Sequence, residues 1–311
     1  MIHHPSKSAA PAVLFVALVS LVGCGVRPAA VTEPRTSGAT LAEAHTATPA
    51  GAQVGRKRQP FRVLFIGNSL TAENDLPRLV AALSVAAGDD PPLEAASVTF
   101  GGFALEDHLA QGDAPRAIAQ GRWDVVVLQQ GPSTLPESRV NLIEYTRRFD
   151  ELIRAAGART AIYGVWTSGD RMFAFDDGIE SYRQAAEAVD GILCPAALAW
   201  KLAWQRDPSL PLYGGDNFHP SILGTYLAAL VIYAELRDKS PVGLPSDIFL
   251  PGYRYTVDPA QARTCQVAAE QVTVTRRRPG KPWGKRHPHA DAPWAEQGPG
   301  RSAQPVPEDV R

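Results

Sequence analysis

The sequence predicts an α/β fold in which helices cover both faces of a parallel sheet, a three-layer α/β/α arrangement. Short apolar runs alternate with helical patterns through residues 60–274. The strongest runs are continuously apolar, which is typical of parallel strands buried on both faces. Alternation of strands with helices throughout favours a single parallel sheet. We therefore expect one folded domain over 60–274.

Five segments have strand patterns. The first, Val63–Ile66, is wholly apolar and runs into Gly67. The segment 123–128 (WDVVVL) is the clearest buried strand, because four of its residues in a row are aliphatic. The predicted strands, in order, are 63–66, 93–100, 123–128, 160–166 and 191–194.

The segments between these strands have apolar residues at helical spacing. The segment 76–87 ends at Gly88, and 141–156 ends at Gly157, as helices often do. A turn-rich loop, 207–220, separates two later helices. The predicted helices are 76–87, 105–110, 141–156, 179–189, 197–205, 223–236 and 259–272.

The composition is that of an ordinary globular protein. Of the 311 residues, 45% are hydrophobic and 20% are charged, and the formal net charge is −1. This charge gives no indication of a nucleic-acid partner. Three cysteines are too few for a disulfide scaffold.

The amino end has the pattern of a targeting segment. Residues 11–22 are almost wholly apolar but too short to span a bilayer comfortably. The following Gly23-Cys24 completes a pattern that resembles the lipobox of bacterial lipoproteins, in which the cysteine is lipidated. A plain secretory signal, or a short anchor helix with an incidental cysteine, is the alternative. Gly25 in place of an aspartate then implies the outer membrane, facing the periplasm. We thus expect a signal peptide over 1–24.

Two further segments lack the periodicity of a fold. Residues 25–59 are rich in Ala, Thr, Pro and Gly, which predicts a flexible tether between lipid and domain. Residues 275–311 begin with Arg276-Arg277-Arg278 and are rich in Pro, Gly, Arg and His, which predicts a disordered basic tail.

Polar residues follow three of the predicted strands. Ser69 follows the first strand, Gly101-Gly102 the second and Gln129-Gln130 the third. In a parallel sheet these positions meet at one edge, where such folds form their sites. Ser69 suits a nucleophile beside backbone N–H groups, although an ordinary helix N-cap explains the residue equally well.

Elimination among the histidines selects a base for such a nucleophile. Only His108 and His219 lie inside the predicted domain. His108 is next to two acidic residues on a short helix, which indicates a surface position. His219 follows Asp216 by three residues in a tight loop, so the carboxylate can reach the imidazole Nδ1 and leave Nε2 facing a serine. The alternative is a turn with incidental polar residues.

Together, Gly67-Asn68-Ser69, Gly102 and Asp216-x-x-His219 resemble the SGNH hydrolases, also called GDSL-like esterases. The resemblance covers roughly residues 61–272 and implies an SGNH/flavodoxin-like fold. It implies that Ser69 is the nucleophile, His219 the base and Asp216 the residue that orients it. The backbone N–H groups of Ser69 and Gly102 would then be two donors of an oxyanion hole.

Two positions depart from the family pattern. The nucleophile block has Asn68 where aspartate is commoner. The third block usually supplies an asparagine amide as the third oxyanion donor, but here the strand ends in Gln129-Gln130. Carbohydrate acetylesterase branches use a glutamine there, so we expect Gln129 to donate, with Gln130 as the fallback.

The resemblance implies a serine esterase that hydrolyses an acetyl or other short-chain acyl ester through an acyl-enzyme and without cofactor or metal. An envelope carbohydrate or small ester is the expected substrate. A non-catalytic glycan- or protein-binding lipoprotein and an O-acyltransferase are the alternatives. Cys194 and Cys265 can pair in an oxidising compartment or stay apart. Aromatic residues Trp166, Phe173 and Phe175 line either a pocket or the core.

Overall fold

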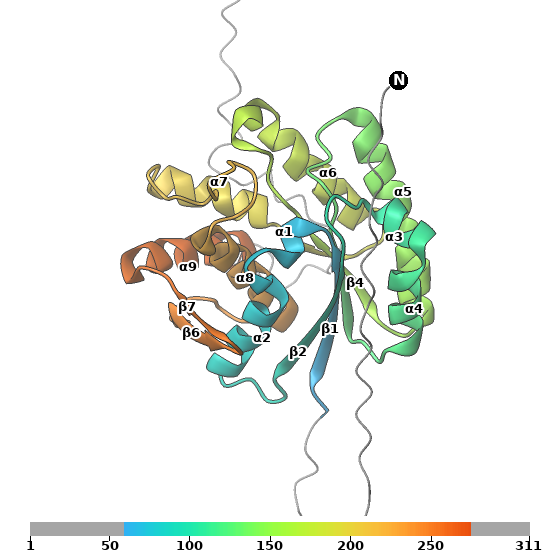
Figure 1. The fold of residues 1–311 in the computed structure, drawn as a ribbon, viewed down its shortest axis with the longest axis horizontal. Coiled ribbons are helices and arrows are strands. Elements are labelled where there is room, and N and C mark those ends of the chain that lie inside the picture. The colour runs from blue at the N-terminus through green and yellow to red at the C-terminus, as the bar shows by residue number, and fades with distance from the viewer. Residues whose placement is uncertain (1–58, 275–311) are drawn as a thin grey trace, which may run out of the picture. The chain divides into compact units, whose positions relative to one another are not determined.

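A computed structural model describes residues 59–274 of this chain, which form a five-stranded parallel sheet (Figure 1). The strand order is β2-β1-β3-β4-β5. Strand β2 lies on one side of β1 and the later strands lie on the other, so a topological switch point lies between β1 and β3. Ligand sites of such sheets form at the carboxyl ends of the strands beside this switch point. The strands are β1 (Phe61–Gly67), β2 (Leu93–Thr99), β3 (Val125–Leu128), β4 (Arg159–Tyr163) and β5 (Ile192–Cys194).

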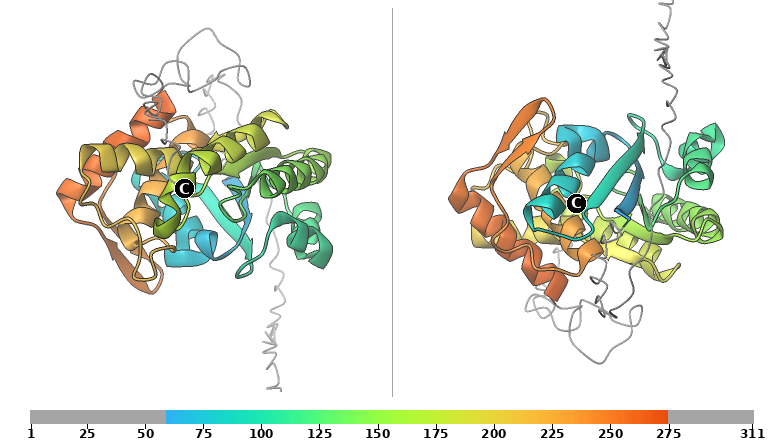
Figure 2. Two further views of the ribbon diagram at one scale, coloured as in Figure 1. Left: turned by 90° about the horizontal axis from the view of Figure 1, so that it is seen from above. Right: turned by 90° about the horizontal axis from the view of Figure 1, so that it is seen from below.

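Helices cover both faces of the sheet (Figures 1 and 2). One layer consists of α2 and α8, with α7 and α9 packed on α8, and the other contains α3, α4, α5 and α6. The three-layer α/β/α fold predicted from the sequence is therefore confirmed. The helices are α1 (Ser69–Ala72), α2 (Leu76–Ala86), α3 (Leu105–Gln111), α4 (Asp113–Gln120), α5 (Pro136–Ala155), α6 (Phe175–Glu187), α7 (Ala196–Arg206), α8 (Ile222–Arg237) and α9 (Pro259–Val274), with short 3-10 turns η1 (Glu73–Asp75) and η2 (Gly169–Ala174).

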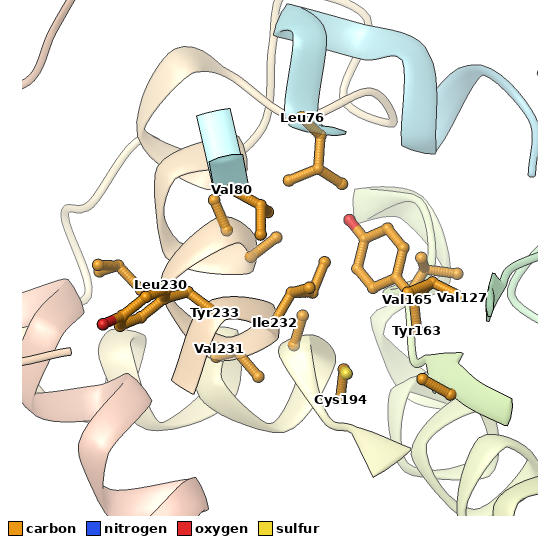
Figure 3. Close-up of a cluster of buried hydrophobic side chains, with 14 of the residues drawn as sticks. Leu76, Val80, Val127, Tyr163, Val165, Cys194, Leu230, Val231, Ile232 and Tyr233 are labelled. Atoms are coloured by element: carbon orange, nitrogen blue, oxygen red, sulfur yellow. The ribbon is translucent and has the colours of Figure 1, made fainter. Parts of the chain in front are cut away.

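The central strands are buried along their length. Residues 63–66 of β1 and 125–128 of β3 are at most 1% exposed, because helices cover both of their faces. Helix α8 is apolar around its whole circumference, and it packs between the sheet and α9. Figure 3 shows side chains of α2 and α8 facing Val127 of β3 and Tyr163 of β4. This continuous core holds the carboxyl ends of β1 and β3 in fixed register, with Ile66 opposite Leu128.

The structure contains elements that the sequence patterns did not predict. Helix α4 follows α3 directly after Gly112, and α5 begins at Pro136 rather than at Asn141. A two-stranded antiparallel hairpin, β6 (Asp247–Leu250) and β7 (Tyr253–Thr256), precedes α9. None of these differences changes the order of the five parallel strands.

The terminal predictions fall on residues outside the described part of the chain. These are the signal peptide 1–24 with Cys24, the tether 25–59 except for its last residue, and the tail 275–311. Within residues 59–274, no helix combines the length and apolar character needed to cross a membrane.

Candidate active site

Strand β1 ends in a tight turn that presents Ser69. Asn68 caps α1, because its Oδ1 accepts the N–H of Leu70 at 3.1 Å, so Ser69 is the first helical residue and not the cap. As the first residue, Ser69 has a backbone N–H with no acceptor inside the helix. Asn68, Leu70 and Thr71 are buried, whereas Ser69 is partly exposed. The turn thus displays one hydroxyl from an otherwise buried segment.

The structure brings Ser69, His219 and Asp216 into one hydrogen-bonded chain. His219 Nε2 lies 2.8 Å from Ser69 Oγ, although the two residues are 150 positions apart in the sequence. His219 Nδ1 lies 2.5 Å from Asp216 Oδ2. The second carboxylate oxygen, Oδ1, accepts the backbone N–H groups of His219 at 2.9 Å and of Phe218 at 3.1 Å. The carboxylate therefore fixes both the ring and the loop that carries it.

These contacts favour the ionised form of Asp216. The hydrogen bond from His219, and then the backbone N–H of Phe218, lower the pKa of Asp216 to about 2. Asp216 stays a carboxylate at neutral pH and accepts a hydrogen bond from the Nδ1–H group of His219. The tautomer with Nδ1–H leaves Nε2 as the acceptor for the Ser69 hydroxyl.

Neighbouring segments hold the His219 loop toward Ser69. Asn74, which follows α1, donates from Nδ2 to the Pro220 carbonyl at 3.0 Å and to Thr225 Oγ1 at 2.9 Å. Trp166 donates from Nε1 to the Phe218 carbonyl at 3.0 Å. The loop is thus tied on one side to the segment after β1 and on the other to the segment after β4.

Gly102 lies in the turn that follows β2, the neighbour of β1. Its φ of +75° lies in the left-handed region, which favours glycine. The backbone conformation and not a lack of space explains the glycine, since a Cβ would meet nothing within 4 Å. Asn68 Nδ2 donates to the Phe103 carbonyl at 3.0 Å, so the Ser69 turn and the Gly102 turn are fastened to each other. The structure therefore brings the Gly102 turn to the same edge as Ser69.

Gln129 occupies a different position from the one expected of an oxyanion donor. Its Oε1 accepts the Asn68 N–H at 2.9 Å and the Thr71 hydroxyl at 2.7 Å. Its Nε2 donates to Asn68 Oδ1 at 2.9 Å and to the Gln130 carbonyl. Both N–H groups are thus used inside the protein, and the side chain is 1% exposed. Gln129 braces the nucleophile turn, and this geometry does not support its expected role as third donor.

The fallback residue, Gln130, is also engaged elsewhere. Its Oε1 accepts the N–H of Leu105 at the start of α3 at 3.1 Å, and its Nε2 donates to Ser133 Oγ at 3.0 Å. Its side chain is 3% exposed. Both glutamines therefore hold loops, and the backbone N–H groups of Ser69 and Gly102 remain the two expected oxyanion donors.

His108 is buried, so the expectation of a surface histidine is wrong. It is 1% exposed, and its Nε2 lies 2.9 Å from the carbonyl of Gly67. Rings of Phe100 and Phe103 pack around it. Burial lowers the pKa of His108, and its Nδ1 has no hydrogen-bond partner. The neutral ring, with its proton on Nε2, thus donates a hydrogen bond to Gly67 in the nucleophile turn. The acidic residues next to His108 in the sequence do not indicate this role.

Gly67 is required by the packing of this turn. A Cβ there would lie 2.4 Å from both Gln129 Oε1 and Thr71 Oγ1. Only a glycine lets the glutamine approach the backbone of the nucleophile turn. The sequence motif includes this glycine. It does not indicate Gln129, the residue whose approach requires the glycine, because Gln129 lies 61 residues beyond Asn68.

The remaining predicted residues lie away from the hydrogen-bonded chain. Trp166 and Phe175 are buried core residues, whereas Phe173 is 82% exposed. Cys194 and Cys265 are buried in β5 and α9, and no disulfide joins them in the described structure. Among residues 59–274, no group of three or more His, Cys, Asp or Glu side chains is placed to hold a metal ion.

A cavity of about 310 Å³ opens beside the His219 loop. Segments after β3 and β4 form its walls, and Phe218 closes one side. The Phe218 and His219 rings lie edge to face with centroids 5.1 Å apart. No local sequence pattern predicts this cavity, because its walls come from three separate loops.

Solved structures provide an independent comparison. A DUF4886 family protein from Bacteroides uniformis matches with a TM-score of 0.56 at 18% identity, over 71% of this chain and 97% of that one. A Slackia heliotrinireducens protein provisionally classed as an SGNH hydrolase is 27% identical over 57% of this chain and 100% of its own, with a TM-score of 0.48. An acetylxylan esterase from Geobacillus stearothermophilus is 17% identical over 58% and 96% of the two chains, with a TM-score of 0.45.

No family model and no curated protein matches the sequence. At these identities the match with a TM-score above 0.5 shows the fold. That fold is the three-layer α/β/α arrangement. The solved structures similar to this chain include proteins described as SGNH and GDSL-like hydrolases.

Proposed function

We propose that this protein is a serine ester hydrolase of the SGNH type. The observation that carries the proposal is the hydrogen-bonded chain from Ser69 Oγ through His219 to the Asp216 carboxylate. A hydroxyl at 2.8 Å from an imidazole nitrogen, with a carboxylate on the other nitrogen, has the geometry of an activated nucleophile. Ser69 is partly exposed, which leaves its hydroxyl open to a substrate.

The reaction proceeds in two halves. His219 Nε2 takes the proton of Ser69 Oγ as the oxygen attacks the ester carbonyl, and the same proton then passes to the leaving alcohol. Water, deprotonated by His219, attacks the acyl-enzyme, releases the acid and returns the proton to Ser69. Backbone N–H groups of Ser69 and Gly102 stabilise the oxyanion in both halves. Asp216 holds the Nδ1–H tautomer and stabilises the imidazolium.

We propose a short acyl group, acetyl above all, on an envelope carbohydrate or a small ester. The amino-terminal sequence supports the location, because Cys24 ends a lipobox-like segment. Lipidation of Cys24 would hold the domain on a membrane, with the outer membrane facing the periplasm as the proposed site. Substitution Cys24→Ala should release the full-length protein from the membrane fraction, and unchanged retention would reject an anchor at that residue.

Hydrolysis of p-nitrophenyl acetate by residues 25–311 tests the activity. Replacement Ser69→Ala should reduce kcat by roughly 10³-fold or more, because the nucleophile is lost while substrate binding remains. Replacement of the exposed Ser209, whose hydroxyl donates to Asp207, is a matched serine control and should leave the rate unchanged. Equal rates for wild type and Ser69→Ala would reject the proposed esterase.

A further inference from the structure

The cavity beside the His219 loop adjoins the proposed catalytic residues through Phe218. Phe218, which lines it, directly precedes His219 and packs edge to face on the imidazole. The segment after β4 is joined to this loop, since Gly169 donates its N–H to the Asn217 carbonyl at 2.9 Å. An ester whose carbonyl lies at Ser69 can therefore extend a second group past Phe218 into the cavity.

Hydroxyl groups dominate the walls of this cavity. Ser133, Thr134, Ser138 and Ser168 line it. Hydroxyl side chains can both donate to and accept from the hydroxyl groups of a sugar. The cavity therefore suits the alcohol part of the ester, a hydroxyl-bearing group.

The charge of the cavity is positive. Arg171 lines it, and no carboxylate of the described residues forms an ion pair with its guanidinium. No Asp or Glu side chain lines the cavity. The nearest carboxylate in sequence, Asp170, is exposed and accepts a hydrogen bond from Ser168, which lowers the pKa of Asp170. The Arg171 guanidinium carbon lies 5.8 Å from the centroid of the Phe173 ring, and its charge also attracts Asp170. Because Arg171 is exposed, its guanidinium is still accessible to a ligand.

We propose that this cavity binds the acidic sugar of the substrate, with Arg171 on the carboxylate and Thr134 beside its hydroxyl groups. The inference rests on the proposed esterase and names its substrate class: acyl esters of carboxylate-bearing sugars. Phe218 packs against the apolar face of the sugar ring. Neutral sugars enter the same cavity but leave the guanidinium without its counter-ion.

Acetate release from acetylated glucuronic acid and acetylated glucose tests this proposal, because the two sugars differ in the carboxylate. Wild type should prefer the acidic sugar in kcat/KM. Substitution Arg171→Gln should lower the ratio of the two kcat/KM values by about two- to fivefold, the size of one partly solvated ion pair. Arg171→Lys should retain part of the preference, and added salt should weaken it in the wild type.

Hydrolysis of p-nitrophenyl acetate provides the control, since this small ester carries no group for the cavity. The matched control variant is Arg148→Gln on the exposed surface of α5, which should leave both the sugar ratio and this rate unchanged. Hydrolysis of p-nitrophenyl acetate by Arg171→Gln shows that its fold and nucleophile are intact. An equal ratio of the two sugars in wild type and Arg171→Gln, with p-nitrophenyl acetate still hydrolysed, would overturn the acidic-sugar proposal alone. Absence of Ser69-dependent hydrolysis of every ester would overturn the proposed function, and this inference with it.

Discussion

Replacement of Gln129 by leucine distinguishes between two roles of its side-chain amide. The sequence pattern predicts an oxyanion donor, whereas the structure places its amide in the brace of the nucleophile turn. Leucine has a similar size but no polar atoms. Gln129→Leu removes the acceptor of the Asn68 N–H and of the Thr71 hydroxyl, which are 2.9 Å and 2.7 Å away.

The expected magnitude follows from these two contacts. Asn68 and Thr71 are 6% and 1% exposed, so water cannot replace the lost acceptor. Each buried donor left without a partner costs about 1–3 kcal/mol. Because the two share one partner and are not independent, we expect a loss of about 2–5 kcal/mol in the free energy of unfolding. This is a large share of the ~5–15 kcal/mol typical of a domain.

Urea denaturation and hydrolysis of p-nitrophenyl acetate form the assay. Gln129→Leu should lower the denaturation midpoint and also reduce kcat/KM, because the Ser69 turn loses its brace. Gln130→Leu is the matched control. It removes the bonds to Leu105 and Ser133, so it should destabilise the protein while the folded enzyme keeps its rate. An unchanged midpoint with kcat reduced by about 10²–10³-fold would refute this reasoning and restore the oxyanion role.

Three further predictions concern the same turn and its base. Gly67→Ala should abolish most activity, because the added Cβ would lie 2.4 Å from Gln129 Oε1; a normal rate and midpoint would contradict this packing. His108→Phe should lower the free energy of unfolding by about 1–3 kcal/mol, because the Gly67 carbonyl loses the Nε2–H donor at 2.9 Å. An unchanged free energy of unfolding would show that this hydrogen bond contributes nothing. The pKa of Asp216 is lowered from 3.8 to about 2, so the stability it contributes should be complete above about pH 5 and lost as pH falls toward 2. Denaturation of wild type and Asp216→Asn at several pH values should show their difference shrinking over that range; a constant difference would contradict the ionised pair.

The sequence patterns were sufficient to predict the parallel sheet and the edge of that sheet where the candidate site lies. The continuous apolar runs of β1 and β3 identify strands buried on both faces, and this property depends on local sequence alone. Ser69 and His219 could be paired from the sequence because only two histidines lie inside the domain and one of them follows an aspartate at the right spacing. The structure brings these residues together at hydrogen-bonding distance.

Features that depend on distant partners could not be predicted. His108 has acidic neighbours in the sequence, but its ring is buried against the Gly67 carbonyl, 41 residues away. Gln129 follows its strand as an oxyanion donor would, yet Asn68 binds both ends of its amide. Local signals also failed for α4, where Gly112 and Pro115 interrupt the helical pattern and only Ala114 and Ile118 are buried. In each case tertiary contacts override the local pattern.

The central claim is that Ser69 is a nucleophile activated by His219, and covalent labelling tests it most directly. A fluorophosphonate forms a stable bond with an activated serine, and mass spectrometry of the intact protein and its peptides locates the adduct. We predict one adduct per chain, on Ser69, with none in Ser69→Ala and strongly slowed labelling in His219→Ala. An adduct on another residue, or equal labelling of wild type and Ser69→Ala, would contradict the account.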